Sequence, residues 1–250
     1  MAEDEYGRDH HNDFDMDSPE FNEHYYDVLN DLVTTCPVAH SKVGNGYYTL
    51  TGYEDVRKTA EDWPTFTSSK GFQPNRPDDM MKLIPVETDP PYHTMWRKVL
   101  NPFFTPEALR SREAGITEKV DRLMTRCVER GTCDFIEDFV NVLPALVFFE
   151  SFLEQEESEI GWVLDVLEVL HTQPERAVEE VPKLFKFCAD LLQERRSEGR
   201  HDDLAGTIAH IGLTGEDGLE LTEKQRIEVI NLMIMAGMAT TMGAMGCTAY

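Results

Sequence analysis

The longest uncharged stretch of the sequence, which includes residues 232–250, sets the strongest limit on what this chain can fold into. It follows polar turns that Thr222 can cap at the start of a helix. A helix over residues 222–250 would be roughly 43 Å long at 1.5 Å per residue, which exceeds the width of a small domain. The sequence therefore predicts a helix that crosses the whole fold.

Three glycines inside this helix require an explanation. Gly237, Gly243 and Gly246 each cost about 1 kcal/mol of helix stability relative to alanine. The close approach of another backbone or of a flat ligand would offset that cost. Ala236, Gly237 and Thr240 share one face, which would be flat with a hydroxyl group at its rim. The alternative is a methionine-rich core helix whose threonines bond back to carbonyl groups.

The uncharged stretch is also close to the roughly 20 apolar residues that a membrane span requires. Its glycines and threonines, and the lack of a basic flank, favour protein surroundings. We expect no membrane association.

A second informative segment is a short helix predicted over residues 90–101. Asp89 can cap its free amides, Pro90 suits its first position, and Pro102 ends it. His93 and Arg97 lie four residues apart and therefore stack on one face. Together they could grip a carboxylate, because Arg supplies a fixed fork of donors and His adds one more. In the alternative interpretation this is a surface helix and Arg97 pairs with a local acid.

The remaining pattern is that of a mainly α protein with a small β element near its N-terminus. An Asn-Gly turn signal predicts a hairpin over residues 43–50, and Gly131 and Gly199 stand where two helices should end. Eleven acidic residues and one basic residue in 1–31 predict an acidic disordered arm over 1–24 and one domain over 25–250. Apart from the helices over 90–101 and 222–250, helical pattern covers residues 106–130, 144–154, 157–172 and 175–198.

Charge and cysteine content exclude several classes of protein. The formal net charge of −24 would repel nucleic acid. Five scattered cysteines without a CxxC spacing argue against a disulfide framework and a zinc site. They fit a reducing cytoplasm, and the first residues lack the features of a secretory signal.

Several segments of residues 34–250 form a characteristic series: Cys36–Ser41, Gly52–Arg57, Phe66–Ser69, Asp89–Arg97, Phe103–Pro106, Asp202–Leu204 and Ala236–Thr241. Taken in this order, they resemble the N-terminal portion of a soluble bacterial-type cytochrome P450, a haem-thiolate monooxygenase, ending within its central I helix. Residues 25–250 would then form the N-terminal part of a single, incomplete cytochrome P450-like domain.

The resemblance implies a haem b cofactor and assigns roles to residues of this chain. His93 and Arg97 would hold a haem propionate, and Ala236 and Gly237 would lie over the haem face. Thr240 would be the catalytic alcohol that helps deliver protons to bound dioxygen.

The implied activity is oxygen insertion into an apolar small molecule, with dioxygen and electrons from a redox partner. Helical periodicity from Thr240 places Leu232 and Ala236 on a substrate cavity, and the resemblance makes residues 72–84 the loop that covers the substrate. A ferredoxin-type donor would face the basic residues near the short helix, since opposite charge speeds association. These residues are Arg97, Lys98, Arg110 and Arg112.

The sequence departs from the family pattern in two places. Ala239 stands where the family usually has an acid just before the catalytic threonine. None of the five cysteines matches the iron-ligating loop, so we expect no metal ligand in this chain. The alternative interpretation is therefore a truncated, non-catalytic binding module of the same fold.

Overall fold

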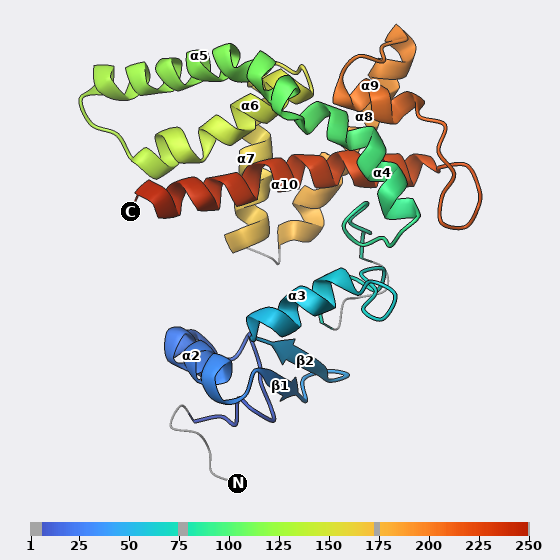
Figure 1. Ribbon diagram of the computed structural model, residues 1–250. Helices are drawn as coiled ribbons and strands as arrows, with labels where there is room; N and C mark the ends of the chain where they lie inside the picture. Colours follow the sequence, from blue (N-terminus) through green and yellow to red (C-terminus); the bar gives the residue numbers. More distant parts are fainter. Residues whose placement is uncertain (1–6, 75–79, 173–175, 250) are drawn as a thin grey trace. The chain divides into compact units, whose positions relative to one another are not determined.

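The computed structural model describes residues 7–74, 80–172 and 176–249 (Figure 1). The chain divides into two compact units. Unit 1 comprises residues 1–82 and 86–89, and unit 2 comprises residues 83–85 and 90–250. Whether residues 25–250 form one domain stays a prediction.

Unit 1 is built from short helices around one hairpin. Strands β1 and β2 pair antiparallel, with Val38 opposite Leu50 and Ser41 opposite Tyr47, so the hairpin begins before the predicted 43–50. Its turn reaches Gly46, whose φ of 79° suits glycine. The elements of unit 1 are α1 (Pro19–Glu23), α2 (Tyr25–Thr35), β1 (Val38–Ser41), β2 (Tyr47–Leu50) and α3 (Tyr53–Glu61).

Residues 7–24, which the composition predicts to be a disordered arm, carry ordered structure. Phe14 and Phe21 are buried in a small core that also contains Leu32 of α2. The Ser18 hydroxyl accepts a hydrogen bond from the Phe21 amide and so caps α1. Two buried aromatic side chains thus supply apolar contact that an average over an acidic segment does not reveal.

A polar contact fastens this segment to α2. His11 Nε2 and Asp31 Oδ2 lie 2.6 Å apart, and the Thr35 hydroxyl donates to the other oxygen of Asp31 at 2.8 Å. Hydrogen bonds from His11 and Thr35 hold the pKa of Asp31 below its ordinary value.

We expect Asp31→Asn to loosen residues 7–18, because it removes the charged acceptor for His11. Amide hydrogen exchange should rise there, whereas Asp27→Asn on the same helix should have no effect, since no described residue pairs with Asp27. The folded pKa of Asp31 is depressed, so the stabilisation is present above the ordinary pKa and is lost as the pH falls through the lowered one. Equal exchange in the two variants would show that the contact does not hold the segment.

Unit 2 is almost entirely helical. Gly131 and Gly199 end α5 and α8 with φ of 76° and 64°, as predicted. Its elements are α4 (Tyr92–Leu100), η1 (Asn101–Phe104), α5 (Pro106–Arg130), the π-helical η2 (Ile136–Val140), α6 (Val142–Phe152), η3 (Glu157–Glu159), α7 (Ile160–Thr172), α8 (Ala177–Glu198), α9 (Leu204–His210) and α10 (Glu223–Ala249).

Helix α10 runs through unit 2 and contacts α6, α8 and α9 (Figure 1). Its first half is buried, with Val229, Ile230 and Ile234 fully covered. The helix is long and apolar enough by length and composition to cross a membrane. However, Arg226 is buried near its start and donates to the carbonyl oxygens of Ile208 and Ile211 at 2.6 and 2.8 Å. These hydrogen bonds satisfy the buried guanidinium inside unit 2.

The start of α4 differs from the prediction. The helix begins at Tyr92, and its N-cap residue, Pro91, makes no side-chain cap. Asp89, expected to be the cap, instead accepts hydrogen bonds from the Thr67 hydroxyl and the Ser68 amide. These bonds hold the pKa of Asp89 below its ordinary value. The carboxylate therefore joins two segments of unit 1 and does not cap α4.

Candidate functional site

Helix α4 turns its aromatic residues inward and its predicted binding pair outward. Tyr92 and Trp96 are buried, and burial raises the pKa of the Tyr92 phenol. His93, one residue further along than Tyr92, is half-buried, and Arg97 is exposed. Residues four apart share a face of a helix, so Tyr92 and Trp96 lie on one face and His93 and Arg97 on the adjoining one. The burial of the aromatic pair therefore fixes the direction of the other pair.

The guanidinium of Arg97 has no ionic or hydrogen-bond partner among the residues that the structure describes. This differs from Arg195 and Arg196, which pair with Asp203 and Glu223 at 2.6 Å. The alternative in which a local acid pairs with Arg97 is thus wrong for the described part of the chain. An unpaired guanidinium in a chain with a net charge of −24 is available for an anion from outside.

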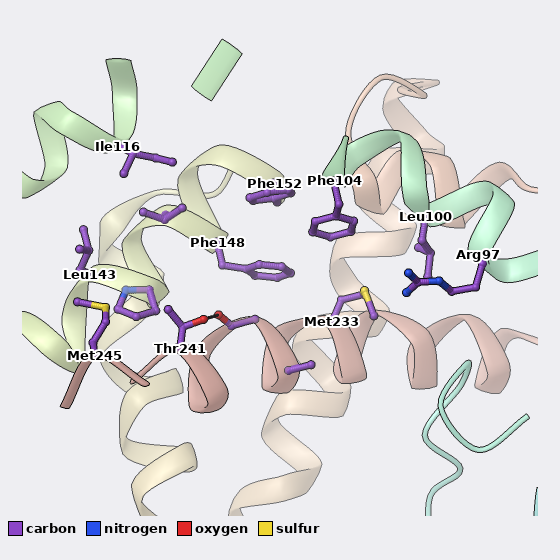
Figure 2. Close-up of a pocket in the computed structure, with 14 residues that line it drawn as sticks. Arg97, Leu100, Phe104, Ile116, Leu143, Phe148, Phe152, Met233, Thr241 and Met245 are labelled. Carbon is purple, nitrogen blue, oxygen red and sulfur yellow. Dashed lines mark hydrogen bonds between the residues drawn. The ribbon is translucent and has the colours of Figure 1, made fainter. Parts of the chain in front are cut away.

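Arg97 lies at the edge of an apolar cavity of about 540 Å³ within unit 2 (Figure 2). Arg97 is the one charged residue among those that line it, and Thr241 supplies a hydroxyl group. Figure 2 shows Arg97 and Leu100 at one end, and Leu143 and Met245 at the other. The lining residues are Arg97, Leu100, Phe104, Ile116, Leu143, Pro144, Val147, Phe148, Phe152, Met233, Ala236, Gly237, Thr241 and Met245.

Three stacked phenylalanines form one wall of this cavity. The ring of Phe152 lies 5.2 Å from that of Phe104 and 5.6 Å from that of Phe148, with interplanar angles of 19° and 16°. The guanidinium of Arg112 lies 4.5 Å above the Phe152 ring. The wall is therefore built by packing within unit 2 and is held by a cation–π contact.

The packing of this wall explains why a glycine stands at position 237. A Cβ atom at Gly237 would lie 2.7 Å from Cδ2 of Phe148, which is too close for two carbon atoms. At Gly243 such an atom would meet nothing within 4 Å, and at Gly246 it would lie 3.6 Å from Ile136. Gly237 thus lets an aromatic ring of α6 approach α10, whereas the prediction invoked a backbone or a flat ligand.

The threonines of α10 bond back along the helix. The Thr240 hydroxyl donates to the Ala236 carbonyl at 2.8 Å, and that of Thr241 donates to the Gly237 carbonyl at 3.3 Å. The threonine-to-carbonyl hydrogen bonds expected for the core-helix alternative are therefore present. Ala236 and Thr240 are both exposed; Ala236 and Thr241 line the cavity, and Thr240 does not.

The structure brings together only part of the predicted site. Arg97, Ala236 and Gly237 line the cavity, but His93, Leu232 and Thr240 do not. Leu232 is buried elsewhere, with 5% of its surface exposed. The sequence analysis missed the residues that complete the cavity, chiefly Phe148, Phe152 and Met233, because nothing in a single sequence says which apolar residues meet across helices. The i, i+4 series 233, 237, 241 and 245 was the signal available on α10.

Two other predictions concern the loop over residues 72–84 and metal binding. Residues 75–79 of the loop lie outside the described residues, and Ile84 is buried in the core of unit 2. In the part of the chain that the structure describes, no group of three or more His, Cys, Asp or Glu side chains could hold a metal ion.

Comparison with known proteins identifies the class of fold. No family model matches the chain. A structure of Mycobacterium marinum cytochrome P450 CYP268A2 in complex with pseudoionone matches with a TM-score of 0.79 and 20% identity, covering 90% of this chain and 59% of that one. Cytochrome P450mel 107F1, with biaryl coupling reactivity, matches with a TM-score of 0.70 and 25% identity, covering 88% and 58%. The chain thus has a mainly α, incomplete P450 fold, as predicted.

Curated proteins of similar sequence are also described as cytochrome P450s or as hydroxylases. A probable cytochrome P450 127A1 from Sinorhizobium fredii is 28% identical over 214 residues, covering 83% of this chain and 50% of the relative. The 6-deoxyerythronolide B hydroxylase of Saccharopolyspora erythraea is 24% identical over 256 residues, covering 94% and 62%. The chain spans about half to three fifths of the length of these relatives. Its sequence is thus similar to part of the cytochrome P450s.

We expect Gly237→Ala and Gly243→Ala to have opposite effects on stability. The methyl group at 237 would collide with Phe148, and such overpacking costs about 1–3 kcal/mol. The same group at 243 meets open space, so the better helix propensity of alanine should stabilise by up to about 1 kcal/mol. Denaturant unfolding measures both changes.

A double-mutant cycle tests whether the contact with Phe148 causes the destabilisation by Gly237→Ala. Phe148→Leu should relieve part of the cost of Gly237→Ala, since a smaller side chain leaves room for the methyl group. Additive effects of the two substitutions would contradict the assigned contact.

Proposed function

We propose that this chain forms part of a haem-dependent monooxygenase, which inserts oxygen from dioxygen into an apolar small molecule with electrons from a redox partner. The observation that supports it best is the unpaired Arg97 at the edge of an apolar cavity beside the small residues of α10. The curated relatives include proteins described as a hydroxylase and as a steroid C26-monooxygenase. This agrees with oxygen insertion as the reaction class.

The residues present fit a haem group in two respects. A haem is a flat apolar ring with carboxylate groups, and the cavity combines apolar walls with a single cationic side chain. Arg97 would bind a propionate, and His93, one turn earlier on the same face, would add a second donor. Ala236 and Gly237 would lie against the ring. When bound, haem supplies the chemistry that activates dioxygen.

Thr240 would hold a proton near that site. Its hydroxyl hydrogen is donated to the Ala236 carbonyl, so its oxygen can accept a hydrogen bond from water on the exposed face. Ala239 offers no carboxylate, and proton transfer would therefore use Thr240 and water. Leu232 and Ala236 would contact the apolar substrate.

The contacts of the basic residues refine the proposal of a ferredoxin-type donor. Arg112 donates to the carbonyl oxygens of Ser151, Ala108 and Phe103, so much of its donor capacity is used inside unit 2. Lys98 and Arg110 are exposed and have no partner among the described residues. These two would supply the positive charge that an acidic electron donor meets. We also propose a cytoplasmic location, consistent with the scattered free cysteines.

We expect Arg97→Ala to weaken the binding of haemin to the full chain by roughly 10- to 100-fold, because a hydrogen bond to a charged group contributes about 1.5–3 kcal/mol. Quenching of tryptophan fluorescence measures the affinity. Arg110→Ala is the matched control, since Arg110 is also exposed and without a partner but does not line the cavity. Equal losses in both variants would mean that only net charge matters, and the propionate assignment would fail.

The carbon monoxide spectrum of the haem-loaded chain tests the iron ligand. None of the five cysteines matches the ligating loop of the family, so we expect no thiolate-type shift of the Soret band. Haem binding without the shift is the result expected for one wall of the haem pocket. A shifted band that disappears in Cys247→Ser would place a ligand on α10 and overturn this assignment. Absence of haem binding would favour a non-catalytic module.

A further inference from the structure

The cavity beside Arg97 is elongated and has its charged residue at one end. Its lining includes Met233, Gly237, Thr241 and Met245, which are four residues apart and therefore follow one face of α10. From the first to the last of them the helix advances roughly 18 Å, at 1.5 Å per residue. In Figure 2, Arg97 lies near Met233 at one end, and Met245 lies at the other end.

The rest of the lining offers an apolar surface. Apart from Arg97, Gly237 and Thr241, the described residues that line the cavity all carry hydrocarbon, aromatic or thioether side chains. The Thr241 hydroxyl donates its hydrogen to the Gly237 carbonyl at 3.3 Å, so it has no second hydrogen for a ligand. Among the lining residues that the structure describes, the side chain that can donate to a ligand is therefore Arg97.

This separation of charge from apolar surface defines a class of ligand. A planar guanidinium presents parallel donors that match the two oxygens of a carboxylate. The stacked rings of Phe148 and Phe152 and the flexible side chains of Met233 and Met245 would contact hydrocarbon. The volume of about 540 Å³ is within the range of roughly 300–1,000 Å³ that is usual for small-molecule sites. A complementary ligand therefore has one carboxylate and a long apolar body.

The length of the cavity sets the length of that body. An extended chain of single bonds advances about 1.2 Å per bond, as the protein backbone does over the three bonds of a residue, so about 15 bonds cover the roughly 18 Å along α10. We propose that the cavity binds an unbranched monocarboxylic acid of about 14 to 16 carbon atoms. Its carboxylate pairs with Arg97, and its chain follows α10 toward Met245.

This binding goes beyond the proposed monooxygenase function, because it uses the shape and charge of the cavity and does not require haem. The haem propionate assigned to Arg97 is also a carboxylate. The acid and haem would therefore compete for the same cation, and each can be tested without the other.

The test uses the full chain and hexadecanoate below its critical micelle concentration, with isothermal titration calorimetry to measure affinity. We expect Arg97→Ala to weaken binding by roughly 10- to 100-fold, because it removes the hydrogen bonds to the carboxylate. Arg110→Ala is the matched control and should leave the affinity unchanged, since Arg110 is exposed but does not line the cavity. Hexadecanol has the same chain without the charge, so it should bind more weakly than hexadecanoate and with equal affinity to the unaltered chain and to Arg97→Ala.

Acids of increasing length test the fit along α10. Each added methylene group should raise the affinity about fourfold until the chain reaches about 16 carbon atoms, and longer acids should gain nothing further. Met245→Trp at the far end should lower the affinity for hexadecanoate and leave that for decanoate unchanged, because the shorter chain does not reach this residue.

Equal losses in Arg97→Ala and Arg110→Ala, equal affinities for hexadecanoate and hexadecanol, or an affinity that does not depend on chain length would each overturn the proposal. Haemin separates this proposal from the haem assignment. If haemin binds through Arg97 and hexadecanoate does not displace it, the acid site is wrong and the haem assignment stands. If hexadecanoate binds through Arg97 in a chain that does not bind haemin, the acid site stands and the haem assignment fails.

Discussion

The close approach of α10 and α6 is the contact on which the cavity depends. Phe148 occupies the position that a side chain at residue 237 would need, so only glycine permits this packing. Phe148 also stacks on Phe152, which stacks on Phe104 and is covered by Arg112. One missing methyl group on α10 thus allows an aromatic wall to form, and that wall encloses apolar space beside Arg97.

The positively charged side chains of unit 2 fall into two groups, those with partners inside the unit and those without a partner among the described residues. Arg195 and Arg226 are buried and satisfied by a carboxylate or by carbonyl oxygens, so they stabilise the fold. Arg97, Lys98 and Arg110 have no partner among the described residues and remain available to anions. In a strongly acidic chain, cations without internal partners mark surfaces for other molecules, and this supports both the propionate and the electron-donor proposals.

The sequence predicted well the features that depend on local backbone preferences, and poorly those that depend on contacts between distant segments. The ends of α5 and α8 at Gly131 and Gly199 followed from the local preference of glycine for positive φ. Helix α9 was missed, because its seven residues give too short a periodic pattern. The order of residues 7–24 was missed because Phe14 and Phe21 gain their stability from α2, a contact that composition does not contain. Asp89 likewise bonds to residues more than 20 positions away.

By itself, the sequence determined the mainly α class, the length of the central helix and the spacing that puts His93 and Arg97 on one face, since these depend on local geometry and periodicity. The tertiary structure decided that Arg97 lacks an internal partner, that Gly237 accommodates Phe148, and that Thr241 rather than Thr240 lines the cavity. The physical reason is that partners and cavities are set by which side chains meet across separate helices, and a helix's own periodicity cannot specify its neighbours.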